Sequence, residues 1–283
     1  MVTQESSNFY TDYALKSFFK NTEIDKDDEF LLINNDKCDA NKFTNYNKVK
    51  IIENDKPVSF AQNVNKIINL GVKKGKDIVF LNNDIIFTKD WFYPLKQNTE
   101  NISIPANNQL FPYHSECGKL KLKITMNLKD FNEEYDLLNN IALKHIKKYK
   151  AGQKFQTLLM PFFCFKIPNK ILKEIGNFDE SFVMGAEDID YRIRCAKKGY
   201  EVNFLIDSYL LHFHGKSTWD GKESVEETNL RNKAYTDIFL KKWGKELTQL
   251  FIIRKDFLNI LNEKNLNELY SKGKFGDLIR KIL

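Results

Sequence analysis

The sequence predicts an α/β protein with a mostly parallel central sheet flanked by helices. Short apolar runs rich in β-branched and aromatic residues alternate with longer segments that have helical spacing. The clearest run, Ile78–Leu81, ends on the polar residues Asn82-Asn83-Asp84. A chain of 283 residues, 42% of them hydrophobic, is large and apolar enough to bury such a core.

The amino-terminal half is predicted to run strand, helix, strand, strand, helix, strand. The expected strands are Met1–Thr3, as the tail of a strand, Glu29–Asn34, Val49–Ile52 and Ile78–Leu81. The expected helices are Tyr10–Phe19 and Phe60–Leu70, the second with Ser59 as its N-cap. The run at Ile78 is apolar throughout, which is typical of a strand buried on both faces.

The carboxyl-terminal half is predicted in the same way. The expected helices are Trp91–Leu95, Asp130–Tyr149, Asn169–Ile175, Glu187–Lys198 and Ser224–Trp243. The expected strands are Ile102–Pro105, Gly118–Met126, Phe162–Ile167, Val202–Ile206 and Tyr209–His214. Lysine alternates with apolar residues in Gly118–Met126, so we expect that strand to be half exposed and antiparallel. From Glu246 a helical pattern continues, broken by Gly273 and Gly276.

Composition narrows the class of protein. The net charge of +6 suits an anionic substrate, nucleic acid or an anionic membrane face, but a lysine-solvated surface is the simpler explanation. No apolar run approaches the roughly 20 residues of a membrane span, and the first residues show no secretory signal. The four cysteines are scattered without metal-binding spacing, which fits a reducing cytoplasm.

Three polar groups lie where strands end or a helix begins. They are Asn82–Asp84 after a strand, Glu187-Asp188 at a helix start, and His212 with His214 after an apolar run. Each has an ordinary structural explanation: an Asx turn, residues that complement the helix dipole, and structural histidines. Together they offer an oxygen ligand, a carboxylate base and an imidazole, the set needed for metal-assisted transfer from an anionic donor.

Two motifs follow LNND at Leu81–Asp84 in order, namely IGNFDESF at Ile175–Phe182 and EDIDYRIR at Glu187–Arg194. Weaker ones are NFYTDYALKSFFKNT from Asn8, INNDKCD from Ile33, FAQNVNKI from Phe60, HFHGKS from His212 and KWG from Lys242. This order resembles that of the family 2 glycosyltransferases, which are inverting enzymes with the Rossmann-like glycosyltransferase A fold. Three features depart from the family: the short first strand, Asn34 in place of an aspartate, and Pro161-Phe162-Phe163 in place of small residues.

The resemblance implies metal-dependent inverting transfer from a nucleotide-diphosphate sugar to a hydroxyl acceptor in a polysaccharide, a lipopolysaccharide or a glycoprotein glycan. Asp84 is the implied ligand of Mn²⁺ or Mg²⁺, joined by His214 or, as second choice, His212. Asp188 is the implied general base, and Glu187 positions that base or the acceptor. Donor contacts are implied for Thr3, Asn34, Asn35, Asn63, Asn82, Asn83, Lys216 and Ser217.

Other classes of protein stay open at this point. A sugar nucleotidyltransferase needs a glycine-rich basic loop after the first strand, and SSNFYTDY is not such a loop. A glycoside hydrolase uses paired carboxylates without a diphosphate site. A catalytically degenerate relative that binds a nucleotide sugar or a glycan is another alternative, and a non-catalytic lectin-like or nucleic-acid-binding protein could use the basic surface. We expect no nucleic-acid partner, because aromatic residues are not interleaved with arginines.

We expect residues 1–245 to form the catalytic domain and residues 246–283 a helical extension. The extension is lysine-rich and partly amphipathic, which favours a packing or homodimer contact, with weak attachment to an anionic membrane face as the alternative. The expected location is the cytoplasm, and the inner face of the membrane is the alternative within it.

Overall fold

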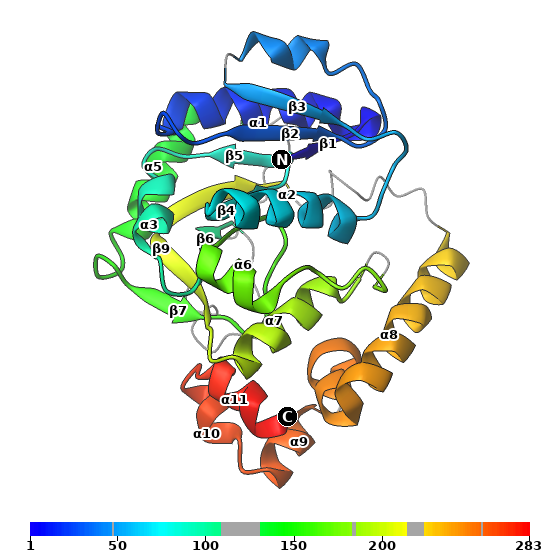
Figure 1. Ribbon diagram of the computed structural model, residues 1–283. Helices are drawn as coiled ribbons and strands as arrows, with labels where there is room; N and C mark the ends of the chain where they lie inside the picture. Colours follow the sequence, from blue (N-terminus) through cyan, green and yellow to red (C-terminus); the bar gives the residue numbers. More distant parts are fainter. Residues whose placement is uncertain (47, 109–130, 183–184, 214–223, 256) are drawn as a thin grey trace.

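Two sheets and their flanking helices make up the computed structural model, which describes residues 1–46, 48–108, 131–182, 185–213, 224–255 and 257–283 (Figure 1). The first sheet is parallel, in the order β1 (Val2–Thr3), β2 (Phe30–Asn34) and β3 (Val49–Glu53). The second has the order β4 (Ile78–Leu81), β8 (Cys164–Ile167), β6 (Ile102–Asn107), β9 (Val202–His212) and β5 (Ile85–Phe87), with β7 (Lys154–Gln156) also on β9.

The α/β class is confirmed, but parallel pairing covers less of the molecule than the sequence predicted. Among the described strands of the second sheet, β6 and β9 alone pair in parallel; the β4–β8, β6–β8, β5–β9 and β7–β9 pairs are antiparallel. The pattern of apolar residues did not reveal this, because a strand buried between two others is apolar throughout whichever way its neighbours run.

All seven helices predicted with bounds are present. They are α1 (Asn8–Asn21), α2 (Phe60–Lys74), α3 (Phe92–Gln97), α5 (Tyr135–Ile146), α6 (Asn169–Ile175), α7 (Glu187–Lys197) and α8 (Val225–Thr248). Short η1 (Glu5–Ser7) and η2 (Asn41–Asn45) lie between strands, and the chain after α8 forms η3 (Gln249–Ile253), α9 (Phe257–Glu263), α10 (Asn267–Ser271) and α11 (Phe275–Ile282). The predicted strand Gly118–Met126 lies outside the described residues.

Helix α2 shows how local sequence sets an element. Ser59 caps its start, because the Ser59 hydroxyl accepts from the Gln62 N–H while the Gln62 side chain accepts from the Ser59 N–H. Gly75 ends it in the left-handed region, with φ 67°. The buried face of α2 then lies in the main core, which also takes side chains from both sheets, for example Leu32 and Phe165.

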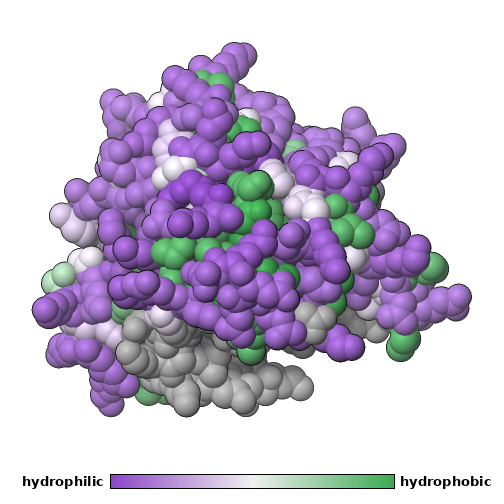
Figure 2. Space-filling model, turned by 90° about the horizontal axis from the view of Figure 1, so that it is seen from below, coloured by the Kyte–Doolittle hydropathy of each residue, from purple (hydrophilic) through white to green (hydrophobic). Residues whose placement is uncertain are grey.

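The carboxyl-terminal helices pack against α7 and α8 at one end of the molecule (Figure 1). Phe275, Leu278 and Ile279 of α11 share a core with Ile189 and Ile193 of α7. Figure 2 shows this end from below, where hydrophobic residues surface in a broken patch among hydrophilic ones. Within the described residues, no helix is both long enough and apolar enough to span a bilayer. The domain division and a dimer or membrane role for these helices stay predictions.

Candidate active site

Strands β4, β5 and β9 bring a buried aspartate and a histidine together. Asp84 lies between β4 and β5 and is inaccessible to solvent, and His212 is the last residue of β9. Oδ1 of Asp84 is 3.3 Å from Nε2 of His212. The β5–β9 ladder sets this meeting, because it pairs Ile85 with His212, and the Phe213 N–H donates to the Asp84 carbonyl at 2.9 Å.

The His212 imidazole is held from two sides. The ring of Phe163 stacks on it with centroids 5.1 Å apart and an interplanar angle of 21°. The Asn108 side chain accepts from the His212 N–H at 2.8 Å and donates to the His212 carbonyl at 3.2 Å. Asn108 was not among the predicted site residues, although it follows β6 as Asn82 follows β4. Its position after a strand was the available signal.

The Asp84–His212 pair fits a divalent cation. Two ligands that bind one ion at about 2.1 Å, at right angles to each other, lie about 3 Å apart, close to the separation found here. One carboxylate oxygen and one imidazole nitrogen suit Mn²⁺ better than Mg²⁺. Among the described residues no group of three or more His, Cys, Asp or Glu could hold a metal ion, so Asp84 and His212 stand as a pair. His214, the other predicted ligand, lies outside the described residues.

The two asparagines before Asp84 face different ways. Asn83 is buried and its amide donates to the hydroxyls of Ser7 and Thr11, each at 2.9 Å, which ties the turn to α1. Asn82 is half-buried, and its backbone N–H donates to the Phe163 carbonyl at 2.7 Å. Asn82 is therefore the better placed of the two for a ligand, and the structure turns Asn83 inward.

Three buried amides meet beside the carboxyl edge of β2 and β3. The Asn35 side-chain oxygen accepts from Asn63 at 3.0 Å, from Asn54 at 2.9 Å and from the Val58 N–H at 3.1 Å. Asn54 also donates to the Asn63 oxygen at 2.9 Å, and Lys66 donates to Asn54. The predicted pair Asn35 and Asn63 is thus brought together, with Asn54 as a member that the sequence did not single out.

Thr3 and Asn34 lie at the same edge and are bonded within the protein. The Thr3 hydroxyl is 2.7 Å from that of Thr11, and both are buried. The Asn34 amide donates to the Cys38 carbonyl at 2.7 Å and to Glu53 at 3.1 Å. A donor contact from Thr3 or Asn34 stays a prediction, as do the roles of Lys216 and Ser217, which lie outside the described residues.

The first turn of α7 carries the predicted base. Asp188 is half-buried, and desolvation by the surrounding protein, reinforced by the Glu187 carboxylate, raises its pKa from the usual 3.8 to about 7. Burial also raises the pKa of Glu187, whose Oε2 has no hydrogen-bond partner among the described residues. A carboxylate with a pKa near neutrality accepts a proton more readily than an ordinary aspartate.

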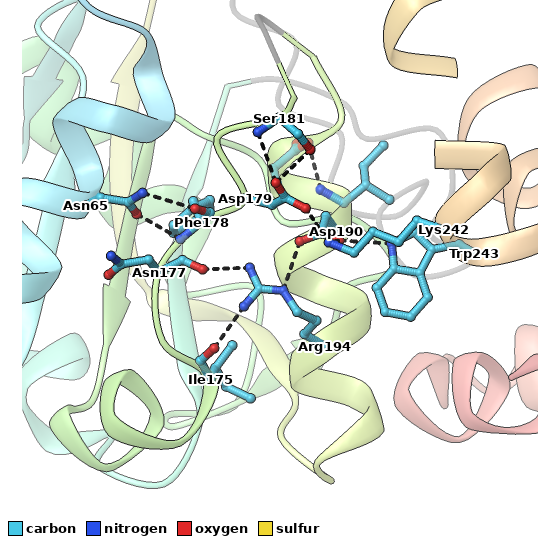
Figure 3. A network of polar contacts seen from close by, with 12 residues as sticks. Asn65, Ile175, Asn177, Phe178, Asp179, Ser181, Asp190, Arg194, Lys242 and Trp243 are labelled. Carbon is cyan, nitrogen blue, oxygen red and sulfur yellow. Dashed lines mark hydrogen bonds and ion pairs between the residues drawn. The ribbon is translucent and has the colours of Figure 1, made fainter. Parts of the chain in front are cut away.

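Two residues after Asp188, the buried carboxylate of Asp190 anchors α7 (Figure 3). One oxygen accepts from the Trp243 indole at 2.9 Å and from Lys242 at 2.6 Å, and the other from Arg194 at 2.8 Å. The Glu-Asp-x-Asp segment and the Lys-Trp-Gly segment, 53 residues apart, therefore meet in one network. Their side chains fix α7 against α8, while Asp188 in the first turn takes no part in this network.

The loop before α7 is held from α2. Asn65 accepts from the Phe178 N–H at 2.8 Å and donates to the Phe178 carbonyl at 3.0 Å (Figure 3). Phe162 packs on Phe178 with centroids 5.4 Å apart, and its neighbour Phe163 stacks on His212. The two phenylalanines that depart from the resembled family thus lie between the Asp84–His212 pair and this loop.

The comparisons with known proteins identify the fold. No protein-family model matches the chain, and no curated protein matches it by sequence. The solved structure of GalNAc-T7 with UDP, GalNAc and Mn²⁺ is 16% identical, covers 95% of this chain and has a TM-score of 0.56. The mannosyltransferase PcManGT of Pyrobaculum calidifontis, in complex with GDP-Man and Mn²⁺, is 11% identical, covers 95% of this chain and has a TM-score of 0.53. TarS 1–349 of S. aureus is 12% identical, covers 98% of this chain and has a TM-score of 0.50.

These likenesses confirm the glycosyltransferase A fold that the sequence predicted. The chain spans half the length of the GalNAc-T7 chain, 71% of PcManGT and 82% of the TarS segment 1–349. At identities of 11–16% the likeness concerns the fold. Membership of family 2 stays a prediction.

Proposed function

We propose that this protein transfers a sugar from a nucleotide-diphosphate sugar to a hydroxyl acceptor with the help of a divalent cation. The observation that carries the proposal is the buried Asp84–His212 pair, whose oxygen and nitrogen lie 3.3 Å apart at the strand ends of a glycosyltransferase A fold. In α/β sheets, ligands bind outside the carboxyl ends of strands. Two structures of this fold, GalNAc-T7 and PcManGT, hold Mn²⁺ together with UDP and with GDP-Man respectively.

Asp84 and His212, with His214 as a further candidate, would hold Mn²⁺, or Mg²⁺ as the alternative. A cation bound there neutralises the negative charge that develops on the leaving diphosphate. Asn82, half-buried beside the pair, faces the donor. The wider donor set comprises Thr3, Asn34, Asn35, Asn63, Asn83, Lys216 and Ser217.

Asp188 acts as the general base of an inverting displacement. Its carboxylate takes the proton of the acceptor hydroxyl while that oxygen forms a bond to the anomeric carbon and the carbon–diphosphate bond breaks. General-base assistance typically contributes ~10²–10⁴-fold, and a pKa of about 7 suits the task at neutral pH. Glu187 positions the acceptor or the base. The acceptor class is a polysaccharide, a lipopolysaccharide or a glycoprotein glycan, and the place of action is the cytoplasm.

A thermal-shift screen against UDP, GDP and dTDP, with and without Mn²⁺, tests the donor site. A ligand that binds only the native state at 100 times its Kd stabilises it by about 2.7 kcal/mol, so one of the three should raise the Tm, and only with the metal. Asp84→Asn should abolish the shift, while Asp90→Asn, an exposed aspartate six residues further on, should keep it. A metal-independent shift, or none, would contradict the proposed site.

The products distinguish the proposed reaction from its nearest alternative. Glycosyl transfer releases a nucleoside diphosphate and leaves the product with inverted anomeric configuration, which NMR of the product reads directly. A sugar nucleotidyltransferase releases pyrophosphate instead, and a degenerate binding protein releases neither. Release of pyrophosphate, or retained configuration, would therefore refute the reaction even if the donor site binds.

A further inference from the structure

The positive charge of this chain is concentrated in one short segment. Residues 137–154 contain five lysines and no aspartate or glutamate, so they supply five of the chain's net six positive charges. We call these lysines the α5 basic face, and they are Lys144, Lys147, Lys148, Lys150 and Lys154. The remaining residues are close to neutral, which makes this segment the source of the basic character of the protein.

The packing of α5 points this face to solvent. Leu138, Ala142 and His145 are buried against the second sheet, where the ring of His145 lies 5.1 Å from that of Tyr209. All five lysines are exposed, and none forms an ion pair with another described residue. Two large apolar side chains stand out beside them, because Leu137 is 46% and Leu143 is 50% exposed.

The helix dipole accounts for part of this pattern only. Asp136 in the first turn of α5 and Lys144 in its last turn match the dipole. Lys150 and Lys154, however, lie beyond the end of the helix, in the turn and on β7. Asp207 is the carboxylate that faces this turn, and it accepts from the Gly152 N–H, not from a lysine.

The α5 basic face is separate from the candidate active site. Helix α5 runs antiparallel to β9: its start follows Phe131, which contacts Phe213, and the chain after it places Lys154 opposite Leu205. From His145, whose ring meets that of Tyr209, the segment runs away from His212 and places Lys154 beside the amino-terminal half of β9. In Figure 1, α5 and β7 lie along one side of the domain and α8 along the other.

We propose that the α5 basic face docks on an anionic phospholipid bilayer. Lysines near such a surface are attracted to its negative potential, and exposed leucines among them can enter the boundary between headgroups and acyl chains. Leu137 and Leu143 supply those apolar contacts. Nucleic acid fits less well, because the segment has no arginine and its Tyr149 is half-buried, so it offers no exposed ring for base stacking.

Vesicle flotation with the whole chain tests the proposal. We expect binding to phosphatidylcholine vesicles that contain 30% phosphatidylglycerol at low salt, no binding to phosphatidylcholine alone, and release at high salt. Each lysine near an anionic surface is worth about fivefold in partitioning, so K144Q/K147Q/K148Q should lower it about a hundredfold. The matched control K233Q/K241Q/K245Q replaces three exposed lysines of α8 and should keep full binding.

A second variant and a second ligand complete the test. The double variant Leu137→Ser/Leu143→Ser should weaken vesicle binding. It should keep the Tm of the unmodified chain, since these two side chains are about half exposed. The proposal would be overturned if the α5 and α8 lysine variants lost vesicle binding equally, or if binding did not depend on the lipid charge. Tighter binding to a 30-nucleotide single-stranded DNA than to anionic vesicles at the same salt would also overturn it. None of these outcomes depends on whether the donor site is active.

Discussion

Asp188→Asn should remove turnover and, at neutral pH, make the fold more stable. The carboxyl group of Asp188 has a pKa of about 7 in the folded protein against a usual 3.8, because folding desolvates it beside Glu187. Between these two values the folded state holds a proton that the unfolded chain has released. Stability therefore falls as the pH rises from about 4 to about 7, and it stays lowered above that range. An asparagine carries no such penalty.

The size of the effect follows from the same two values. Each pKa unit corresponds to about 1.4 kcal/mol, so a change from 3.8 to about 7 sets a ceiling of about 4 kcal/mol. The Asp188 side chain is half-buried, and water that reaches it screens part of the cost. We therefore expect Asp188→Asn to raise the free energy of unfolding by about 2 kcal/mol at pH 8 and by little at pH 4.

Urea unfolding of both proteins at pH 4 and pH 8 measures this difference directly. Asp136→Asn is the matched control, because Asp136 is an exposed carboxylate in the first turn of α5. Turnover by the unmodified chain should also rise with pH through about 7, since only the carboxylate form accepts the proton. Equal stability of Asp188→Asn and the unmodified chain at pH 8, or strong turnover by Asp188→Asn, would refute the assigned role of Asp188.

Three structural substitutions should lower the free energy of unfolding in urea. Trp243→Phe removes the indole donor from the buried carboxylate of Asp190 and should cost about 1–3 kcal/mol; no loss would show that its other donors suffice. Gly276→Ala should cost about 1–3 kcal/mol, because the new methyl group would overlap the Glu201 carboxylate, which is paired with Arg192 and Arg280; unchanged stability would mean that this carboxylate moves freely. Asn65→Ala should cost about 2 kcal/mol by freeing the loop backbone before α7, and a fully stable variant would contradict that anchoring role.

The elements that the sequence predicted best are those set by local signals. Strand Ile78–Leu81 and helix Asn169–Ile175 have the predicted bounds, because short apolar length or a flanking proline and glycine delimit them. Strand β5 was missed, since its three residues form a strand only through pairing with β9, more than 120 residues away. Two strands were predicted where β9 is continuous, because Asp207 and Ser208 interrupt its apolar run.

In the candidate site, too, the sequence predicted what local signals determine and missed what long-range contacts determine. Asp84, His212 and Asp188 could be named because a carboxylate or imidazole after a strand or at a helix start is visible in the sequence. The inward turn of Asn83 depends on contacts with residues more than 70 positions earlier in the chain. Asn108 likewise bonds to the backbone of His212, 104 residues on. Contacts of this kind follow from the assembled fold, and no local pattern encodes them.

Asp188 and Asp190 lie on the same helix but have contrasting surroundings. This contrast explains how α7 can serve both stability and chemistry. Asp190 is fully buried, yet it accepts from Trp243, Lys242 and Arg194, so its charge is compensated and anchors α7. Asp188 lies half a turn earlier, where its carboxylate accepts from the adjacent Ile189 N–H and lies beside the like-charged Glu187, so burial and repulsion raise its pKa. Because the Asp190 contacts hold α7 in place, the negative charge of Asp188 can remain poorly compensated. The helix does not shift to bring that charge into a better environment. We therefore expect that loosening the Asp190 network, as in Trp243→Phe, lowers the pKa of Asp188 along with the stability of the helix, and the pH profile of turnover by that variant measures the change.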